Sequence, residues 1–257
     1  ANTTGTNNTA VGFDALKTVT TNGANVAIGR NALRYSTAAN NTAVGSSAGE
    51  ETTTGANNVF VGKDAGVANT TGGNNVVVGA NALDANTTGD ENTAIGDGAL
   101  SANTTADRNV AVGARTLLIN TTGASNVAVG YEALEVNTTA SNNTAVGSLA
   151  LTANTTGTNH VAIGQNAMAA TTTGNDNVGI GRQALDANTT GGANVAIGSD
   201  ALGACTTASS NTAVGYNALL ASTTGTENVA VGRGTLDATG AGTDGSYNVA
   251  IGNDALT

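Results

Sequence analysis

The sequence contains a single histidine and a single cysteine, the side chains that most often carry acid–base and nucleophilic catalysis. His160 occupies a position that is Asn in the 14 other copies of a sequence repeat, so a tolerated substitution explains it better than a general base. Cys205 stands where Asn or Ser usually begins an Asn-Thr-Thr segment, and no His accompanies it in that repeat. We therefore expect no catalytic residue, no cofactor and no enzymatic activity.

Carboxylates could instead bind calcium. Asp14, Asp64, Asp200 and Asp254 each lie two residues after a Val-Gly or Ile-Gly pair. Acids do not recur at this place in every repeat, and the calcium-binding pattern G-G-x-G-x-D is absent. We expect no metal site, and interpret the acids as a solvated face that keeps the protein soluble.

Eleven Asn-x-Thr sequons would permit N-glycosylation in a host with that machinery. The alternative is that Asn-Thr-Thr is turn chemistry, with side chains that bond the backbone at a corner. We favour turn chemistry, because the Thr column persists where the Asn does not, as at Thr172, Thr206 and Thr223. The candidate glycosylation sites within Asn-Thr-Thr are Asn2, Asn69, Asn86, Asn103, Asn120, Asn137, Asn154 and Asn188, and the others are Asn7, Asn40 and Asn142.

The composition excludes several classes of protein. Only four Tyr and two Phe are present, with no Trp, no Pro and 36 Gly, which argues against a compact enzyme core. The abundance of Asn, Thr and Gly argues against a helical bundle, and the low charge and many β-branched residues argue against disorder. A net charge of −10 with scattered bases argues against nucleic acid as a partner, and no apolar stretch is long enough for membrane insertion.

A repeat of 17 residues fills the chain. We take as marker the Gly of each Val-Gly or Ile-Gly pair. Successive markers are 17 residues apart except for one spacing of 16 and one of 20, so residues 30–45 and 233–252 form irregular coils. The unit reads N-[TV]-A-[VI]-G-x-x-A-L-x-x-N-T-T-G-x-x. The markers are Gly12, Gly29, Gly45, Gly62, Gly79, Gly96, Gly113, Gly130, Gly147, Gly164, Gly181, Gly198, Gly215, Gly232 and Gly252.

So short a unit cannot fold alone, but stacked copies can pair their strands. Each unit has one strand of about five residues, a Gly break, a short apolar piece and a polar turn. Identical residues would then lie one above another at ~4.8 Å, and Asn columns could bond along the stack. We expect Gly at the marker and after Asn-Thr-Thr to supply positive φ at corners. The fold class is therefore all-β: a parallel β-solenoid of 15 coils over 1–257, a rod on the order of 70 Å long.

Alternation along the strand predicts two uncharged faces. Val or Ile before the marker shares one face with Thr or Val, and Ala27, Ala128 and Ala196 mark the other. Phe60 replaces the usual Ala, while Gly49 and Gly66 replace the usual Leu in neighbouring coils, which indicates volume compensation in one core. The Ala and Leu columns should face inward, and the Val/Ile stripe should face a partner, for example around a threefold axis.

Thr columns also raise the idea of ice binding. Adjacent Thr residues point to opposite faces of an extended chain, so only one row would be exposed. That is weaker than a face with two Thr rows, and we do not favour it.

The two ends of the chain match. The segment from Gly252 to Thr257, followed by residues 1–12 of another copy, restores a marker spacing of 17 and reads G-N-D-A-L-T-A-N-T-T-G across the junction. No polar cap is evident at either end, where a solenoid normally carries one. Either subunits stack head-to-tail, or the chain is a slice of a longer array. Since the chain begins with Ala, we expect either that a leader was removed or that the sequence is an excerpt of a longer protein. The expected end-to-end interface comprises Ala1, Asn2, Thr3, Thr4, Ala255, Leu256 and Thr257.

The strand motif resembles a known group. Asn25-Val26-Ala27-Ile28-Gly29 followed by Ala32, and the corresponding segment 194–198 followed by Ala201, are similar to the head repeats of trimeric autotransporter adhesins and to repeats of phage tail-fibre-like surface proteins. The resemblance spans the chain and implies a left-handed β-roll, a trimer and surface adhesion. The period here is 17 rather than 14, and no neck, stalk or anchor is evident.

We therefore expect a structural protein of an extracellular, cell-surface or virion fibre, built by head-to-tail stacking of copies of itself. The alternative is a trimeric adhesin head or tail-fibre shaft that binds a surface glycan or protein ligand. Tyr35, Tyr131, Tyr216 and Tyr247 are too few and too scattered to favour a binding face, which favours the structural role.

Overall fold

The computed structural model describes residues 2–237 and 245–257. Within these residues there are 15 strands and no helix. The chain forms two compact units, Ala1–Asn126 and Val127–Thr257, and each is described by itself. The first unit holds β1 (Thr9–Val11), β2 (Val26–Ile28), β3 (Thr42–Val44), β4 (Val59–Val61), β5 (Val76–Val78), β6 (Thr93–Ile95) and β7 (Val110–Val112). The second holds β8 (Val127–Val129), β9 (Thr144–Val146), β10 (Val161–Ile163), β11 (Val178–Ile180), β12 (Val195–Ile197), β13 (Thr212–Val214), β14 (Val229–Val231) and β15 (Val249–Ile251).

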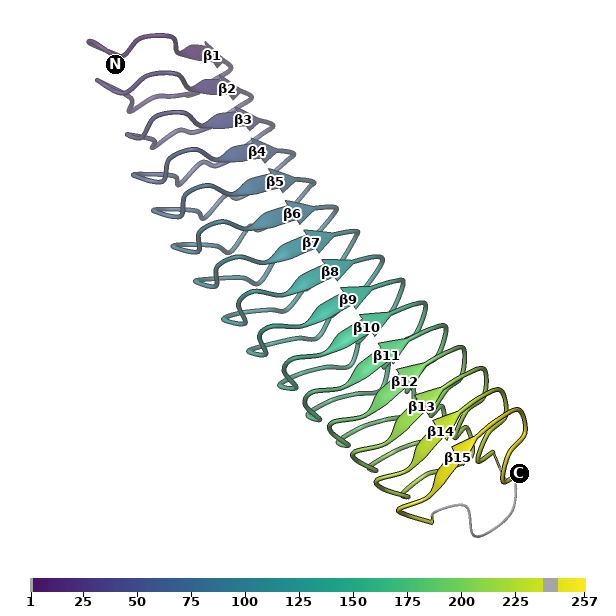
Figure 1. Cartoon of the computed structure of the whole chain (residues 1–257). Helices are drawn as coiled ribbons and strands as arrows, with labels where there is room; N and C mark the ends of the chain where they lie inside the picture. Colours follow the sequence, from purple (N-terminus) through teal and green to yellow (C-terminus); the bar gives the residue numbers. More distant parts are fainter. Residues whose placement is uncertain (1, 238–244) are drawn as a thin grey trace. The chain divides into compact units, whose positions relative to one another are not determined.

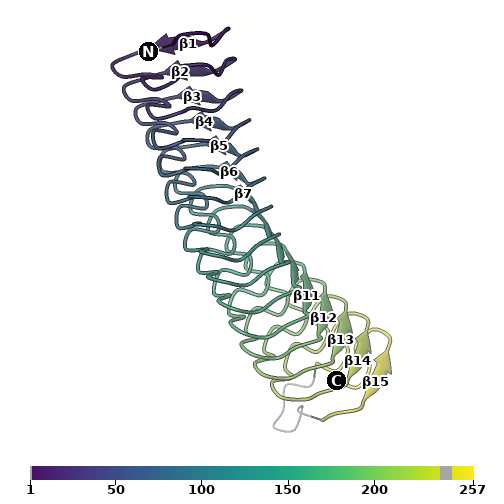
Figure 2. The ribbon, with the colours of Figure 1, turned by 90° about the vertical axis from the view of Figure 1, so that its left-hand side faces the viewer.

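Within each unit every strand pairs in parallel with the next strand along the chain (Figure 1). The register joins like positions, as where Val59 pairs with Val76 and Val61 with Val78. Each coil leaves its strand, turns through a loop and returns one strand further along (Figure 2). The prediction of an all-β parallel β-solenoid with a 17-residue repeat is confirmed.

Each strand is three residues long, shorter than the five expected. The marker glycine ends it, because the φ of this residue is between 131° and 147° in the coils. An L side chain rarely adopts that conformation. A Cβ on Gly62 would also lie 2.4 Å from the carbonyl oxygen of Gly79 in the next coil. The expectation that the marker needs Gly for its positive φ is confirmed.

The expectation of positive φ at the Gly after Asn-Thr-Thr is wrong. Gly72 has no such φ, and Ala106, Ala140 and Ala208 take the same place in other coils. The coils approach closely here, since a Cβ on Gly72 would lie 2.4 Å from the carbonyl oxygen of Gly89, so an Ala at this place requires a local shift of the backbone. The left-handed positions lie elsewhere, and one of them is the buried Leu column, as at Leu83 with φ 50°.

The Ala and Leu columns form the interior, as predicted from the sequence. Ala27, Ala128 and Ala196 have no exposed area, and neither do Leu33 and Leu83. The Ala of the strand and the Leu beyond the corner therefore face each other inside the coil. Burial of these apolar side chains stabilises the stack by about 25 cal/mol per Å² removed from water.

Phe60 confirms the predicted compensation of volume. Its ring is fully buried. A Cβ on Gly49 would lie 2.6 Å from the ring atom Cδ2, so the ring fills space that neighbouring coils give to Leu.

The irregular coils keep strand register. Between β2 and β3 one residue is missing, yet Val26 still pairs with Thr42. Between β14 and β15, Val229 pairs with Val249, although residues 238–244 of that expanded loop lie outside the described residues. Differences of length are absorbed in the loops.

Candidate functional site

The inner Asn column, four residues before each marker, joins successive coils from inside. The Oδ1 atom of Asn58 accepts the backbone N–H of Asn75 at 2.9 Å. Its Nδ2 atom donates to the carbonyl oxygen of Gly72 across the same coil, at 2.9 Å. One buried side chain thus satisfies backbone groups in two coils, which explains why the column is so uniform.

The loop Asn column, seven residues after the marker, forms a second ladder. The Nδ2 atom of Asn86 donates to Oδ1 of Asn69 at 2.7 Å and to the carbonyl oxygen of Gly89 at 3.1 Å. In the second unit, Nδ2 of Asn154 donates to Oδ1 of Asn137 at 3.1 Å. The expected bonding between Asn side chains along the stack is found here, whereas the inner column bonds mainly to the backbone.

This ladder bears on the candidate glycosylation sites. Seven of the eight within Asn-Thr-Thr are fully buried, and only Asn2, in the terminal coil, is exposed. A glycan needs a side-chain amide that reaches solvent, so their placement in the folded chain favours the turn-chemistry interpretation. The seven buried residues are Asn69, Asn86, Asn103, Asn120, Asn137, Asn154 and Asn188. The other sequons begin at Asn7, Asn40 and Asn142, which are exposed.

His160 lies in the inner Asn column and takes over part of its bonding. Its Nδ1 atom accepts the N–H of Asn177 at 3.2 Å, and its own N–H donates to Oδ1 of Asn143 at 3.0 Å. The side chain is buried, and loss of hydration lowers the pKa of the imidazole below 6.5. The ring therefore links coils in its neutral form.

Cys205 occupies the loop Asn column. Its thiol is buried, with Sγ 3.8 Å from the carbonyl oxygen of Ala208. Burial raises the pKa of the thiol to about 11, so a reactive thiolate is scarce at neutral pH. His160 and Cys205 stand in different columns of different coils.

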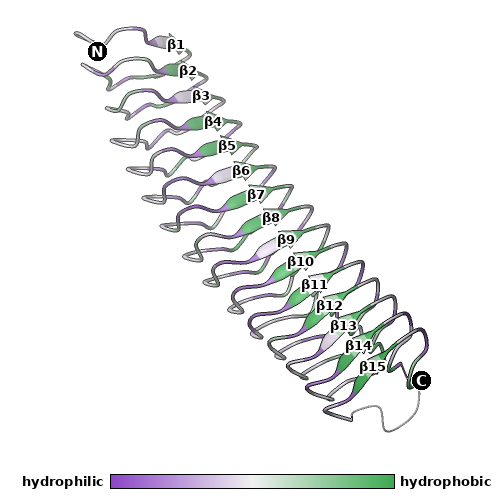
Figure 3. Cartoon of the chain, viewed as in Figure 1, coloured by the Kyte–Doolittle hydropathy of each residue, from purple (hydrophilic) through white to green (hydrophobic). Residues whose placement is uncertain are grey.

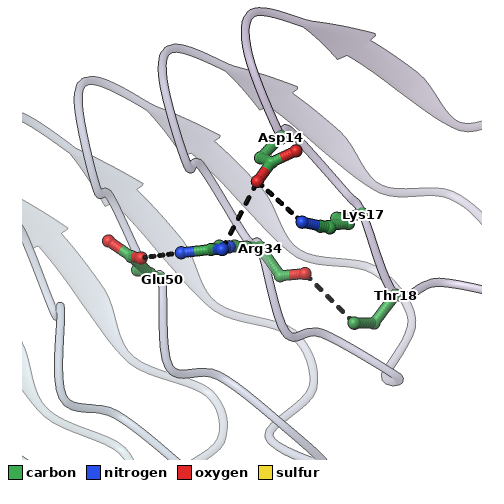
Figure 4. A network of polar contacts seen from close by, with 5 residues as sticks. All are labelled: Asp14, Lys17, Thr18, Arg34 and Glu50. Carbon is green, nitrogen blue, oxygen red and sulfur yellow. Dashed lines mark hydrogen bonds and ion pairs between the residues drawn. The ribbon is translucent and has the colours of Figure 1, made fainter.

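Several acids pair with bases on the surface, among them Asp14, Glu50 and Asp200. Asp14 contacts Lys17 at 2.9 Å and Arg34 at 3.4 Å, and Arg34 also contacts Glu50 at 3.4 Å. The Thr18 hydroxyl donates to the carbonyl oxygen of Arg34 at 3.1 Å, which completes a network across three coils (Figure 4). No group of three or more His, Cys, Asp or Glu side chains able to hold a metal ion lies in residues 2–237 and 245–257.

The outward face of the strands carries only Val, Ile and Thr. Figure 3 colours most strands as hydrophobic, and the paler strands, such as β3 and β9, begin with Thr. Ile28 exposes 40% of its area and Val78 37%, although both lie in interior coils. Each unit therefore presents an uncharged, half-exposed strand face.

The two Thr columns differ in burial. The first Thr after the loop Asn bonds to the next coil, as where the hydroxyl of Thr70 donates to the carbonyl oxygen of Thr87 at 2.8 Å. The second, such as Thr71 or Thr88, is exposed. Only one row faces outward, as the sequence indicated.

The N-terminal segment has the form of the second half of a coil. Nδ2 of Asn2 donates to the carbonyl oxygen of Gly5 at 2.8 Å, and the N–H of Gly5 donates to Oδ1 of Asn2 at 2.9 Å. Asn86 and Gly89 make the same pair of bonds in an interior coil. Ala1, part of the expected end-to-end interface, lies outside the described residues.

The C-terminal segment has the form of the first half of a coil. Gly252, Asp254 and Leu256 have the φ values of the corner, 132°, 52° and 55°. Leu256 is 63% exposed, whereas the Leu column is buried in interior coils. Ala255 is half-buried, and Thr257 is exposed.

The unpaired edges of β1 and β15 add groups that the sequence analysis did not include. Asn8 and Gly12 lie on the outer edge of the first coil, and Val249 and Ile251 on that of the last. The repeat pattern in the sequence could have identified these residues, because they belong to the first and last copies of a strand that pairs on both sides in every interior coil.

No helix that is long and apolar enough to span a membrane occurs in the part of the chain that the structure describes. Comparison with protein-family models, with curated proteins and with solved structures finds no match to this chain.

Proposed function

We propose that this chain is a structural subunit of an elongated extracellular, cell-surface or virion fibre, in which copies stack head-to-tail. The observation that carries the proposal is the complementarity of the ends. Residues 252–257 adopt the first half of a coil, and residues 2–5 adopt the second half. The last coil of one copy would thus be completed by the first residues of the next.

The backbone groups at the two edges are complementary as well. In interior coils, the N–H of Val59 donates to the carbonyl oxygen of Asn75, and the N–H of Gly62 donates to that of Val44, at 2.9 and 2.8 Å. With the same pattern across a junction, the N–H of Val249 in one copy would donate to the carbonyl oxygen of Asn8 in the next copy. The N–H of Gly12 in the next copy would donate to the carbonyl oxygen of Ile251 in the first.

The apolar interior supports the same joint. Leu256 and Ala10 are exposed, although their columns are buried in interior coils. Stacking a second copy on the open coil would remove both from water, which is favourable in proportion to the apolar area covered. It would also cover the sheet edges, which otherwise invite uncontrolled pairing.

Electron microscopy of the purified chain, with its mass by light scattering, tests the proposal. Fibres one subunit wide, with an axial repeat on the order of 70 Å from 15 coils, are the expected result. A finite monomer at high concentration would overturn it.

A matched pair of variants tests the joint itself. Val249→Pro removes the N–H that would cross the junction and should abolish fibres. Val249→Thr keeps that N–H and a residue type found at this place in β3, so it should assemble normally. Circular dichroism checks that both variants remain folded.

The second candidate is a trimeric adhesin head or tail-fibre shaft with a surface glycan or protein ligand. The half-exposed, uncharged strand face favours it, because apolar stripes of this kind commonly pack against a partner. The resemblance to adhesin head repeats points the same way. Discrete particles of three chains, with no end-to-end growth, would support this function in place of the fibre.

A further inference from the structure

An acid and a base join neighbouring coils at a fixed pair of repeat positions. Asp14 lies two residues after its marker, and Arg34 lies five residues after the marker of the next coil. Their side chains are 3.4 Å apart. Lys17, five residues after the first marker, reaches back to Asp14 in its own coil at 2.9 Å. A base at this place thus reaches the acid of its own coil or of the preceding one (Figure 4).

The two terminal coils carry the same pair of positions. Asp254 lies two residues after the last marker, and Lys17 lies five residues after the first. In a head-to-tail joint with an unbroken spacing of 17, Lys17 of the next copy takes the place relative to Asp254 that Arg34 takes relative to Asp14. Both side chains are half-exposed, Asp254 at 51% and Lys17 at 51%.

Charge at the joint requires such a base. Stacking would bring Asp14 of the next copy over Asp254, because both lie two residues after a marker. Asp237 also lies within the field of Asp254, since burial and then the charge of Asp254 raise the pKa of its carboxyl. Arg233 lies 3.9 Å from Asp254 on the same copy and compensates only in part. Lys17 would stand between the two stacked carboxylates, as Arg34 stands between Asp14 and Glu50.

We propose that the joint between copies is closed by an ion pair between Asp254 of one copy and Lys17 of the next, so that assembly depends on ionic strength. This inference rests on the proposed head-to-tail fibre. It makes the partner a second copy of this chain in one register, selected by charge as well as by backbone pairing.

The experiment measures the critical concentration for fibre formation by sedimentation at low salt. Lys17→Glu and Asp254→Lys should each raise it by roughly tenfold, and the double variant should restore it. At 1 M salt, where the screening length is about 3 Å, the differences between variants should shrink. Lys63→Glu is the matched control, because it makes the same charge change on an exposed lysine in an interior coil and should leave assembly unchanged.

The outcomes separate this inference from the fibre itself. If the unmodified chain forms fibres and Lys17→Glu behaves like Lys63→Glu, the ion pair is refuted and the fibre stands. If the double variant stays as impaired as either single variant, the pairing of these two residues is refuted. If the unmodified chain forms no fibre at any salt concentration, the proposed function fails and this inference fails with it.

Discussion

Phe60 fills the space that a side chain at position 66 would need: a Cβ on Gly66 would lie 2.2 Å from Cε1 of the ring. One large residue and two small ones, in two successive coils, therefore occupy a common volume. The trio can be changed only together, and this supplies a stability test.

Phe60→Ala should destabilise the first unit by about 3–5 kcal/mol, because Ala leaves a cavity that two neighbouring glycines cannot fill. Adding Gly49→Leu and Gly66→Leu restores the residues usual in the repeat and should recover most of the loss. Urea unfolding followed by circular dichroism measures the midpoints. A triple variant no more stable than Phe60→Ala would contradict the shared volume.

Asn58→Ala should cost about 1–3 kcal/mol, since it leaves the N–H of Asn75 buried without its partner and removes one of the two donors to the carbonyl oxygen of Gly72, the other being Asn69. Thr71→Ala, at an exposed place in the same coil, should change stability by less than about 0.5 kcal/mol. Thermal unfolding of both variants provides the comparison. Equal midpoints would show that the inner Asn column is not a structural requirement.

His160 should make the second unit less stable in mild acid. Burial lowers its pKa in the folded state below 6.5, so the unfolded chain binds the proton first as the pH falls. The contribution of the neutral imidazole to the free energy of unfolding is then fully present above pH 6.5 and is lost as the pH falls below that value. A protonated Nδ1 also cannot accept the N–H of Asn177.

The comparison is with His160→Asn, which restores the residue usual in the column. Melting temperatures at pH 7.5 and pH 5 should differ more for the unmodified chain than for the variant. The unmodified chain and the variant have the same carboxylates, so the contribution of these groups to the pH dependence of the melting temperature cancels in this comparison. Parallel pH profiles would rule out the histidine as the source.

The thiol of Cys205 should not react in the folded chain at pH 8, because it is buried and its pKa is raised to about 11. A thiol-specific dye should label it only after unfolding in urea. Cys205→Ser combined with Thr207→Cys moves the thiol to an exposed neighbour, which should label at once. Rapid labelling of the native thiol would contradict its buried place in the loop Asn column.

Much of the fold follows from spacing. Fifteen markers at a nearly constant interval predict stacked coils, and the exchange among Phe60, Gly49 and Gly66 predicts which face lies inside. The stacking and the inward face can both be predicted because residues in neighbouring coils contact each other. The residue types allowed in one repeat therefore depend on those in the next, and this dependence can be seen in the sequence.

Other features depend on backbone conformations that residue type does not reveal. Leu83 is left-handed although Leu disfavours that region, because burial in the core outweighs the local cost. Gly72 lies where the coils approach closely and not where φ is positive, and these two settings cannot be distinguished from the residue type alone. The direction of the inner Asn side chains, across the coil to Gly72, likewise required the path of the chain.

The undisturbed pairing of Val26 with Thr42 across a shortened loop has a genetic consequence. Each coil contacts only its neighbours, and irregular spacing is accommodated away from the strand. An in-frame duplication or loss of one repeat would therefore create no contact that the protein does not already contain. Unequal recombination between repeats could lengthen or shorten the gene coil by coil, and selection would act on the reach of the product while its packing stayed the same.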